Sequence, residues 1–232
     1  MKLTVFGATG GVGREVVNQA LDRGDHVTAY VRNPAKLDLT DPNLTVNAGE
    51  LTDGEEVRRA VRGTDAVVSA LGPSLDRKAT GTPLVDGTRA VVEAMQAEGV
   101  ERYIGMATPS LRDPRDTRSL LGLIVPFMGR TFLSRAYREL LAMSQLVTDS
   151  PLDWTIARFT RPTDGARIGT VRAGYLGRDR IRASITRADI ATFLLDQTTD
   201  PPYPRAWMFL EAILAPLARD PRLFPPFGSG GG

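Results

Sequence analysis

The chain has 232 residues, of which 42% are hydrophobic and 24% charged, as in a folded globular protein. Its 29 basic and 27 acidic residues nearly balance, so the composition predicts no nucleic-acid partner. The absence of cysteine, and a single histidine at His26, exclude disulfides, thiolate or histidine metal sites, cysteine nucleophiles and histidine triads. No apolar run reaches the roughly 18 residues of a membrane span, and the glycine-rich start leaves no room for a signal peptide. We therefore expect a cytoplasmic protein with no metal and no membrane span.

The first thirteen residues predict a strand, a tight turn and the start of a helix. An apolar run ends at Phe6, glycines follow, and a helical pattern begins near Arg14. The glycines let backbone approach a ligand, and the N–H groups of a helix N-terminus attract its negative charge. The spacing is Gly-x-x-Gly-x-x-Gly, not Gly-x-Gly-x-x-Gly, but the place between strand and helix favours a pyrophosphate site over a plain left-handed turn. The expected cofactor contacts in this turn are Gly7, Thr9, Gly10, Gly11, Val12 and Gly13.

Strands alternate with helices along the rest of the chain. Apolar runs predict strands at 26–31, 44–46, 65–70, 103–107, 153–157 and 206–210. Helical spacing predicts a first helix that ends before Gly24, and further helices at 53–61, 83–98, 134–148 and 186–197. This alternation predicts an α/β fold with a doubly wound parallel sheet and helices on both faces.

We expect a single domain over residues 1–227, with a small substrate region built from segments after the fourth strand, and a flexible Gly/Ser tail over 228–232. Residues 160–185 are rich in glycine and arginine and predict short strands at most. The apolar segment 119–128 contains a glycine and a proline, which argue against a regular helix. A substrate lid, an oligomer contact and ordinary core remain open for it.

Several motifs together resemble a known family. They are residues 7–13, Arg32, 70–72, 88–95, 99–103 and 152–158. These stretches resemble the atypical short-chain dehydrogenases/reductases, in the NAD(P)H-binding branch of the NmrA-like proteins and the biliverdin-IXβ/flavin reductases. The resemblance covers roughly residues 1–200. It implies a Rossmann-like fold and an NAD(P)H cofactor, and it says little about the substrate.

The residue after the second strand bears on the choice between NADP and NAD. NAD-selective sites have an acidic residue near here for the ribose 2′-hydroxyl, whereas an arginine accommodates a 2′-phosphate. Arg32 occupies this place with no acid at the strand end, which favours NADP(H) over a merely solvated arginine. The resemblance further implies that Glu50 and Leu51 flank the adenine, where the alternative is a loop before a helix cap.

Small residues end the fourth strand, beside the crevice in which open α/β sheets bind ligands. Ala70, Leu71 and Gly72 are expected to lie against the cofactor, with plain strand-end packing as the alternative. Thr108, after the fifth strand, could hydrogen-bond the nicotinamide carboxamide or a substrate oxygen, or simply cap the turn before Pro109.

The residues that follow the sixth strand are candidates for the substrate site. The resemblance places this stretch over the nicotinamide. Phe159 would contact the cofactor or stack on a planar substrate, and Thr160 and Arg161 would complete the substrate side, with Arg161 pairing with an anionic group. The alternatives are a core phenylalanine and a surface arginine.

The usual catalytic pair of short-chain dehydrogenases is absent from the sequence. That pair is Tyr-x-x-x-Lys, in which the lysine lowers the pKa of the tyrosine. Four residues after each of the five tyrosines stands a residue other than lysine, and no lysine follows Lys78. Tyr137, next to Arg138, is the tyrosine we retain as a catalytic candidate beside Thr108, although an arginine cannot cycle its proton.

These features predict an NADPH-dependent oxidoreductase that passes hydride to a flat conjugated acceptor, such as a flavin, quinone or carbonyl compound. Such acceptors can take their proton from solvent, and the cofactor supplies the chemistry. A second hypothesis is a non-catalytic NADP(H)-binding redox sensor of the NmrA kind. A third, an epimerase-like or sugar-modifying enzyme, needs a proton-transfer pair that the sequence lacks. The expected partner is a small-molecule substrate, and the chain is expected to be a monomer or homodimer.

Overall fold

The computed structural model describes residues 1–74, 81–109, 111, 113–117, 134–159, 161–169, 171–175, 184–199, 203 and 205–212. The strands are β1 (Lys2–Phe6), β2 (His26–Val31), β3 (Leu44–Ala48), β4 (Ala66–Ser69), β5 (Arg102–Ala107), β6 (Asp153–Arg158), β7 (Arg161–Thr163), β8 (Val171–Gly174), β9 (Ser184–Thr186) and β10 (Ala206–Ala212). The helices are α1 (Gly11–Asp22), α2 (Gly54–Val61), α3 (Pro83–Glu98), α5 (Ser134–Thr148) and α6 (Arg187–Thr199), with a short 3₁₀ turn at Pro34–Lys36.

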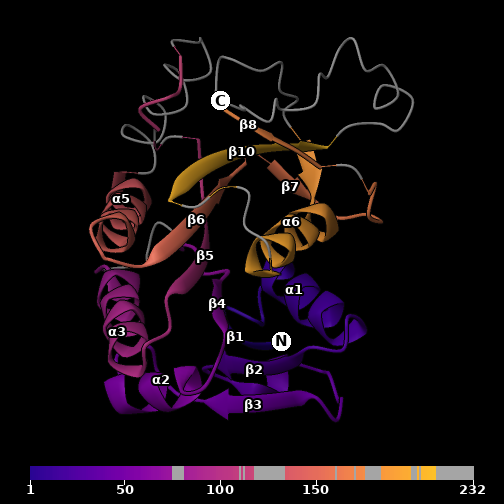
Figure 1. The fold of residues 1–232 in the computed structure, drawn as a ribbon, viewed down its shortest axis with the longest axis vertical. Coiled ribbons are helices and arrows are strands. Elements are labelled where there is room, and N and C mark those ends of the chain that lie inside the picture. Colours follow the sequence, from indigo (N-terminus) through magenta and orange to yellow (C-terminus); the bar gives the residue numbers. More distant parts are fainter. Residues whose placement is uncertain are drawn as a thin grey trace, which may run out of the picture.

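Eight strands form one sheet in the order β3-β2-β1-β4-β5-β6-β10-β8. All neighbours pair in parallel except β8, which runs antiparallel to β10 (Figure 1). β7 and β9 form a separate parallel pair. Because the chain builds outward from β1 to β3 and then crosses over to β4, the strand order reverses between β1 and β4. In open α/β sheets this reversal marks the place where ligands bind.

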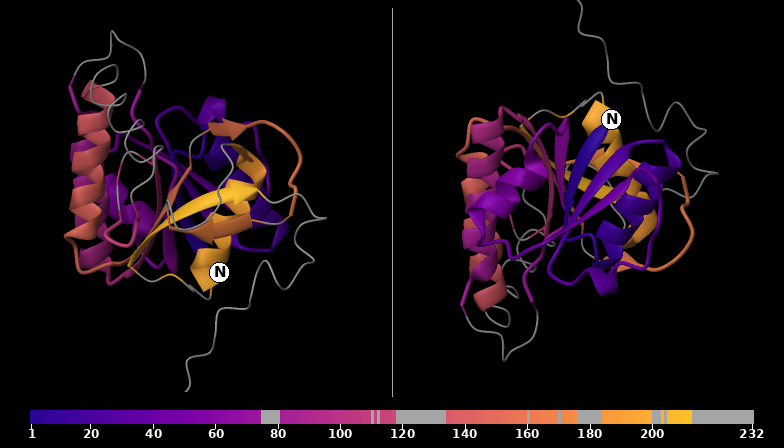
Figure 2. Two further views of the ribbon diagram at one scale, coloured as in Figure 1. Left: turned by 90° about the horizontal axis from the view of Figure 1, so that it is seen from above. Right: turned by 90° about the horizontal axis from the view of Figure 1, so that it is seen from below.

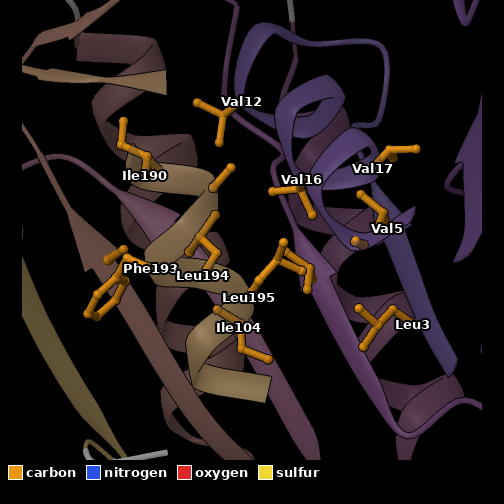
Figure 3. Close-up of a cluster of buried hydrophobic side chains, with 14 of the residues drawn as sticks. Leu3, Val5, Val12, Val16, Val17, Ile104, Ile190, Phe193, Leu194 and Leu195 are labelled. Carbon is orange, nitrogen blue, oxygen red and sulfur yellow. The ribbon is translucent and has the colours of Figure 1, made fainter. Parts of the chain in front are cut away.

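Helices cover both faces of the sheet, which confirms the predicted fold class. α1 and α6 pack on one face, and α2, α3 and α5 pack on the other (Figures 1 and 2). Side chains along β1 point alternately to the two faces of the sheet. Leu3 and Val5 belong to the core under α1 and α6, and Phe6 belongs to the core under α2 and α3. Figure 3 shows the first of these cores, with Val16 of α1 and Leu194 of α6 above the strands.

Most predicted boundaries agree with the structure to within a few residues. The helix predicted to start near Arg14 begins three residues earlier, at Gly11, because the glycine turn itself adopts the first helical residues. Asp53 caps α2 by accepting a hydrogen bond from the Glu56 N–H at 3.2 Å, and Thr186 accepts one from the Asp189 N–H at 3.0 Å. The single domain over 1–227 stays a prediction. The segment 119–128 and the tail over 228–232 lie outside the described residues.

Candidate functional site

The glycine turn after β1 lies at the point where the strand order reverses. Gly7 has a φ of +79°, a left-handed conformation that favours glycine. A β-carbon on Gly7 would lie 2.8 Å from the carbonyl carbon and oxygen of Ala70, and one on Gly13 would lie 2.2 Å from the Gly7 carbonyl oxygen. The Gly10 N–H closes the turn by donating to that same oxygen at 2.9 Å. β1, α1 and the end of β4 therefore approach too closely for any side chain.

The N-terminus of α1 is open for an anion. Its N-cap residue is Gly10, which makes no side-chain cap, and its first turn contains no acidic residue. The positive end of the helix dipole is therefore not offset by a carboxylate of the helix itself. Thr9, Gly10 and Gly11 are all exposed, so a ligand can reach the backbone of the turn. Exposed glycine backbone at an uncapped helix N-terminus fits the pyrophosphate of a dinucleotide.

Two basic side chains flank the loop after β2. Arg32 directly follows the strand and is exposed. Arg14 of α1 donates to the Lys36 carbonyl oxygen at 2.5 Å, which holds a second guanidinium beside this loop. Sequence reasoning did not single out Arg14, because its partner lies 22 positions away and no local pattern marks the contact.

Tyr30 fixes the loop after β3. Its hydroxyl donates to the Glu50 carbonyl oxygen at 2.9 Å, and a β-carbon on Gly49 would lie 2.2 Å from that hydroxyl oxygen. Burial, together with the carboxylates of Asp53, Glu56 and Glu50, raises the pKa of Tyr30 to about 12. The hydroxyl therefore stays protonated and remains a donor. The exposed Glu50 side chain is held at the same edge of the sheet as the glycine turn.

The residues expected to line the cofactor after β3 and β4 differ in how exposed they are. Leu51 is half-buried and packs on α3, where its Cβ lies 2.7 Å from the place of a β-carbon on Gly87. Ala70 is buried against the glycine turn, Leu71 is half-buried and Gly72 is exposed. The chain that follows β4 therefore passes from the core to the surface beside Gly7.

β5 and β6 end side by side, since the Phe159 N–H donates to the Ala107 carbonyl oxygen at 3.4 Å. Thr108 is exposed directly after β5, and Arg161 is exposed in β7. Phe159 is only 8% exposed and belongs to the core under α1 and α6, so stacking of its ring on a substrate stays a prediction. Thr160 lies outside the described residues.

A buried ion pair holds the loop that follows Thr108. Arg158, at the end of β6, is fully buried, and its two terminal nitrogens donate to the carboxylate of Asp116 at 2.5 and 2.9 Å. They also donate to the carbonyl oxygens of Leu111 at 3.0 Å and Trp207 at 3.2 Å. One guanidinium thus joins β6, β10 and the residues that follow β5.

A second buried carboxylate continues this network. The Asp113 carboxylate accepts two hydrogen bonds from the Arg115 guanidinium, at 2.8 Å each. It also accepts one from the backbone N–H of Trp207 at 3.4 Å. The pKa of Asp113 is lowered, since the bonds from Arg115 outweigh its burial. The Arg115 guanidinium also lies over the Tyr175 ring, 4.6 Å from its centre. Charged groups at Asp113, Arg115 and Asp116 therefore hold the described part of this loop.

Tyr137 lies half-buried in the first turns of α5. Its neighbour Arg135 donates to Glu139 at 3.0 Å and to the Ser74 carbonyl oxygen. Glu139 is 1% exposed and accepts a hydrogen bond from the Leu84 N–H at 3.0 Å. This arginine and glutamate join α5 to the start of α3 and to the segment that follows β4.

Neither a metal site nor a membrane span is found in the part of the chain that the structure describes. There, no three histidine, cysteine, aspartate or glutamate residues cluster as metal ligands. No described helix is long and apolar enough to cross a bilayer.

A glycine turn at the strand-order reversal, followed by an uncapped helix N-terminus, is the arrangement in which open α/β sheets bind dinucleotides. Residues 7–201 match the family described as NAD(P)H-binding. The chain therefore belongs to this NAD(P)H-binding family, among the atypical short-chain dehydrogenases/reductases, as its motifs predict.

Two distant relatives match most of the chain. Oxidoreductase stcQ of Emericella nidulans is 28% identical over 83% of this chain and 75% of its own length. Uncharacterized protein YwnB of Bacillus subtilis is 27% identical over 87% of this chain and 93% of its own. Other curated relatives are longer, and the match to 3-beta-hydroxysteroid dehydrogenase of Mycolicibacterium neoaurum, 32% identical over 47% of this chain, spans 32% of that protein.

The fold is shared with solved structures. ChuY, an anaerobillin reductase from Escherichia coli O157:H7, superposes with a TM-score of 0.72 at 22% identity, over 91% of this chain and 97% of that one. A short-chain dehydrogenase/reductase from Veillonella parvula, solved in complex with NADP, gives a TM-score of 0.71 at 18% identity, over 91% and 94%. These likenesses show the same fold.

We expect Gly13→Ala to destabilise the chain. The added methyl would collide with the Gly7 carbonyl, which is backbone and cannot rotate away, so the free energy of unfolding should fall by about 2 kcal/mol or more. Gly54→Ala is the control, because a β-carbon there meets nothing within 4 Å. Urea unfolding of both variants tests the prediction, and equal stability of Gly13→Ala and the native chain would contradict it.

Asp116→Ala should be costly as well. The substitution leaves the buried Arg158 cation without its carboxylate, and such losses lower the free energy of unfolding by about 3–5 kcal/mol. Glu56→Ala removes the partner of exposed Arg59 and should cost less than about 1 kcal/mol. Both values come from denaturant titration at neutral pH. A similar cost for the two variants would show that the buried pair does not anchor the loop.

Proposed function

We propose that the protein is an NADPH-dependent reductase that reduces a flat conjugated acceptor, such as a flavin, a quinone or a conjugated carbonyl compound. The observation that carries the proposal is the exposed, uncapped helix N-terminus at the carboxyl edge of the sheet. The uncapped N-terminus of α1 lies at the strand-order reversal, and exposed Thr108 stands at the end of β5 on the same edge. When bound, the nicotinamide supplies a hydride donor, and the protein supplies binding and orientation.

The preference for NADPH rests on charge at the end of β2. Arg32 is exposed where NAD-selective proteins have an acidic residue, and Arg14 is held next to the same loop through Lys36. A guanidinium offers a planar set of donors that matches a phosphate. The Veillonella parvula neighbour solved with NADP agrees with this preference.

Adenosine and nicotinamide would be held from different strands. Glu50 and Leu51 would flank the adenine, and Ala70, Leu71 and Gly72 would lie along the middle of the cofactor. Thr108 would donate its hydroxyl to the carboxamide or to a substrate oxygen. Phe159 and Arg161, with Thr160, would complete the substrate side beyond β6.

The described side chains favour an acceptor that takes its proton from water. Tyr103 is buried, and burial raises its pKa to about 12, so it is a poor acid–base group near neutral pH. Arg135 is paired with Glu139, and a guanidinium is a poor group for proton transfer. Tyr137 is the remaining candidate on α5. Flavins and quinones need no dedicated proton donor, and the names oxidoreductase and reductase borne by stcQ and ChuY agree with this class of reaction.

The missing Tyr-x-x-x-Lys pair also favours a second function, a non-catalytic sensor that binds NADP(H) and changes its affinity for a partner protein. Both functions use the same cofactor site. They differ in whether bound NADPH is consumed, so turnover distinguishes them. In either case we propose a cytoplasmic protein that acts as a monomer or homodimer.

Arg32→Ala should weaken NADPH binding about 10- to 100-fold and leave NADH binding within about twofold, since a charge-assisted hydrogen bond to the 2′-phosphate is lost. Arg62→Ala, at the opposite edge of the sheet beside Glu98, is the control and should change neither affinity. Fluorescence titration with both cofactors gives the dissociation constants. Native protein that binds NADH as tightly as NADPH would overturn the assignment.

The reductase proposal is tested by following NADPH absorbance with purified protein and a panel of flavins, quinones and aldehydes. We expect turnover with at least one flat acceptor, a fall of about 10-fold or more in Thr108→Ala, and little change in Tyr137→Phe if the proton comes from solvent. A rate that collapses only in Tyr137→Phe would make that tyrosine the proton donor. Tight NADPH binding without turnover on any acceptor would favour the sensor.

A further inference from the structure

Arg187, the first residue of α6, lies over the cofactor turn. A β-carbon on Gly11 would lie 2.6 Å from Arg187 Nε and 2.7 Å from its Cδ, so the side chain crosses directly above the Gly11 backbone. Gly11 is exposed and is the first residue of α1. The Arg187 guanidinium is therefore held beside the helix N-terminus at which the pyrophosphate would bind.

Helix packing fixes this placement. Val12 and Val16 of α1 and Ile190 of α6 share one core (Figure 3). Polar contacts set how far one helix is shifted along the other, since Gln19 Nε2 donates to the Ala188 carbonyl oxygen at 2.9 Å. Thr192 donates to Gln19 Oε1 at 2.8 Å, and Arg23 pairs with Asp196 at 2.8 Å. The two helices run in the same direction, so both N-termini lie at the carboxyl edge of the sheet.

The charge on Arg187 stands at an unfavourable place for α6 alone. A cation in the first turn opposes the helix dipole. The carboxylate of that turn, Asp189, is fully buried and already accepts hydrogen bonds from Thr186 and from the Ile168 and Gly169 N–H groups. A residue that destabilises its own helix is expected where its side chain binds a ligand.

The partner of Arg187 is weakly held. Its guanidinium pairs with Asp164, whose side chain is 95% exposed. Ion pairs this exposed contribute little, because water screens them. Arg187 itself is 29% exposed, so it can exchange one anionic partner for another without leaving its place over Gly11.

We propose that Arg187 binds the pyrophosphate of NAD(P)H, exchanging Asp164 for the phosphate oxygens. In this arrangement the pyrophosphate lies between the N-terminus of α1 and the guanidinium from α6. The second half of the chain thereby contributes a phosphate contact opposite the glycine turn of the first half.

The experiment compares ligands with and without a pyrophosphate by calorimetric titration. Arg187→Met keeps the apolar stem over Gly11 and removes the charge. We expect it to bind NADP⁺ and 2′-phospho-ADP-ribose about 10- to 100-fold more weakly, the effect of losing a charge-assisted hydrogen bond. Its affinity for adenosine 2′-monophosphate, which has no pyrophosphate, should stay within twofold of native. Asp164→Asn should bind NADP⁺ as tightly as native or tighter, because a competing carboxylate is gone.

Arg23→Met is the matched control, since it removes the ion-paired arginine at the other end of the same two helices. It should change none of the three affinities. Arg187→Met that binds NADP⁺ within twofold of native would overturn the proposal, as would an equal loss for all three ligands, which would indicate a distorted turn. Unfolding curves confirm that each variant is folded. Because NAD⁺ carries the same pyrophosphate, the same comparison with NAD⁺, ADP-ribose and adenosine tests the proposal independently of cofactor preference and turnover.

Discussion

The close approach of Gly13 to the Gly7 carbonyl is the constraint on which the site depends. A methyl group at position 13 would lie 2.2 Å from that oxygen, so α1 can reach β1 only through a bare α-carbon. Gly7 meets the end of β4 with the same closeness. These two contacts bring a helix N-terminus and two strand ends to one point, and that point is where the strand order reverses. The cofactor edge is therefore a product of backbone packing before any side chain contributes.

The helices differ in whether an acidic residue stands in the first turn. α2, α3 and α6 each carry an acidic residue in the first turn, which offsets the positive end of the helix dipole. α1 carries none, and its N-cap is a glycine. The helix at the strand-order reversal thus keeps its positive end free of its own carboxylates, unlike α2, α3 and α6, whereas α5 also has no acidic residue in its first turn. In the arrangement that we propose, the two phosphates of the cofactor would supply the negative charge that α1 lacks.

Local patterns were enough to predict the fold and the cofactor class. The alternation of strands and helices, the glycine turn and the caps at Asp53 and Thr186 are all set by residues within a few positions of each other. The contacts that sequence reasoning missed join distant parts of the chain. Arg158 and Asp116 are 42 positions apart, and nothing in the neighbourhood of either predicts a fully buried pair. Arg187 likewise meets Gly11 only because α6 packs along α1.

The side of the site that we propose for the substrate is held together differently from the cofactor side. Its wall is held by arginines that are already paired, Arg158 with Asp116 and Arg135 with Glu139. A guanidinium keeps its proton throughout the pH range in which proteins are folded, so these residues fix geometry and transfer no proton. The sequence contains no Tyr-x-x-x-Lys pair, and these two arginines act as supports. The reaction that we propose would therefore draw its proton from water or from Tyr137, which suits acceptors that become stable once they have gained a hydride.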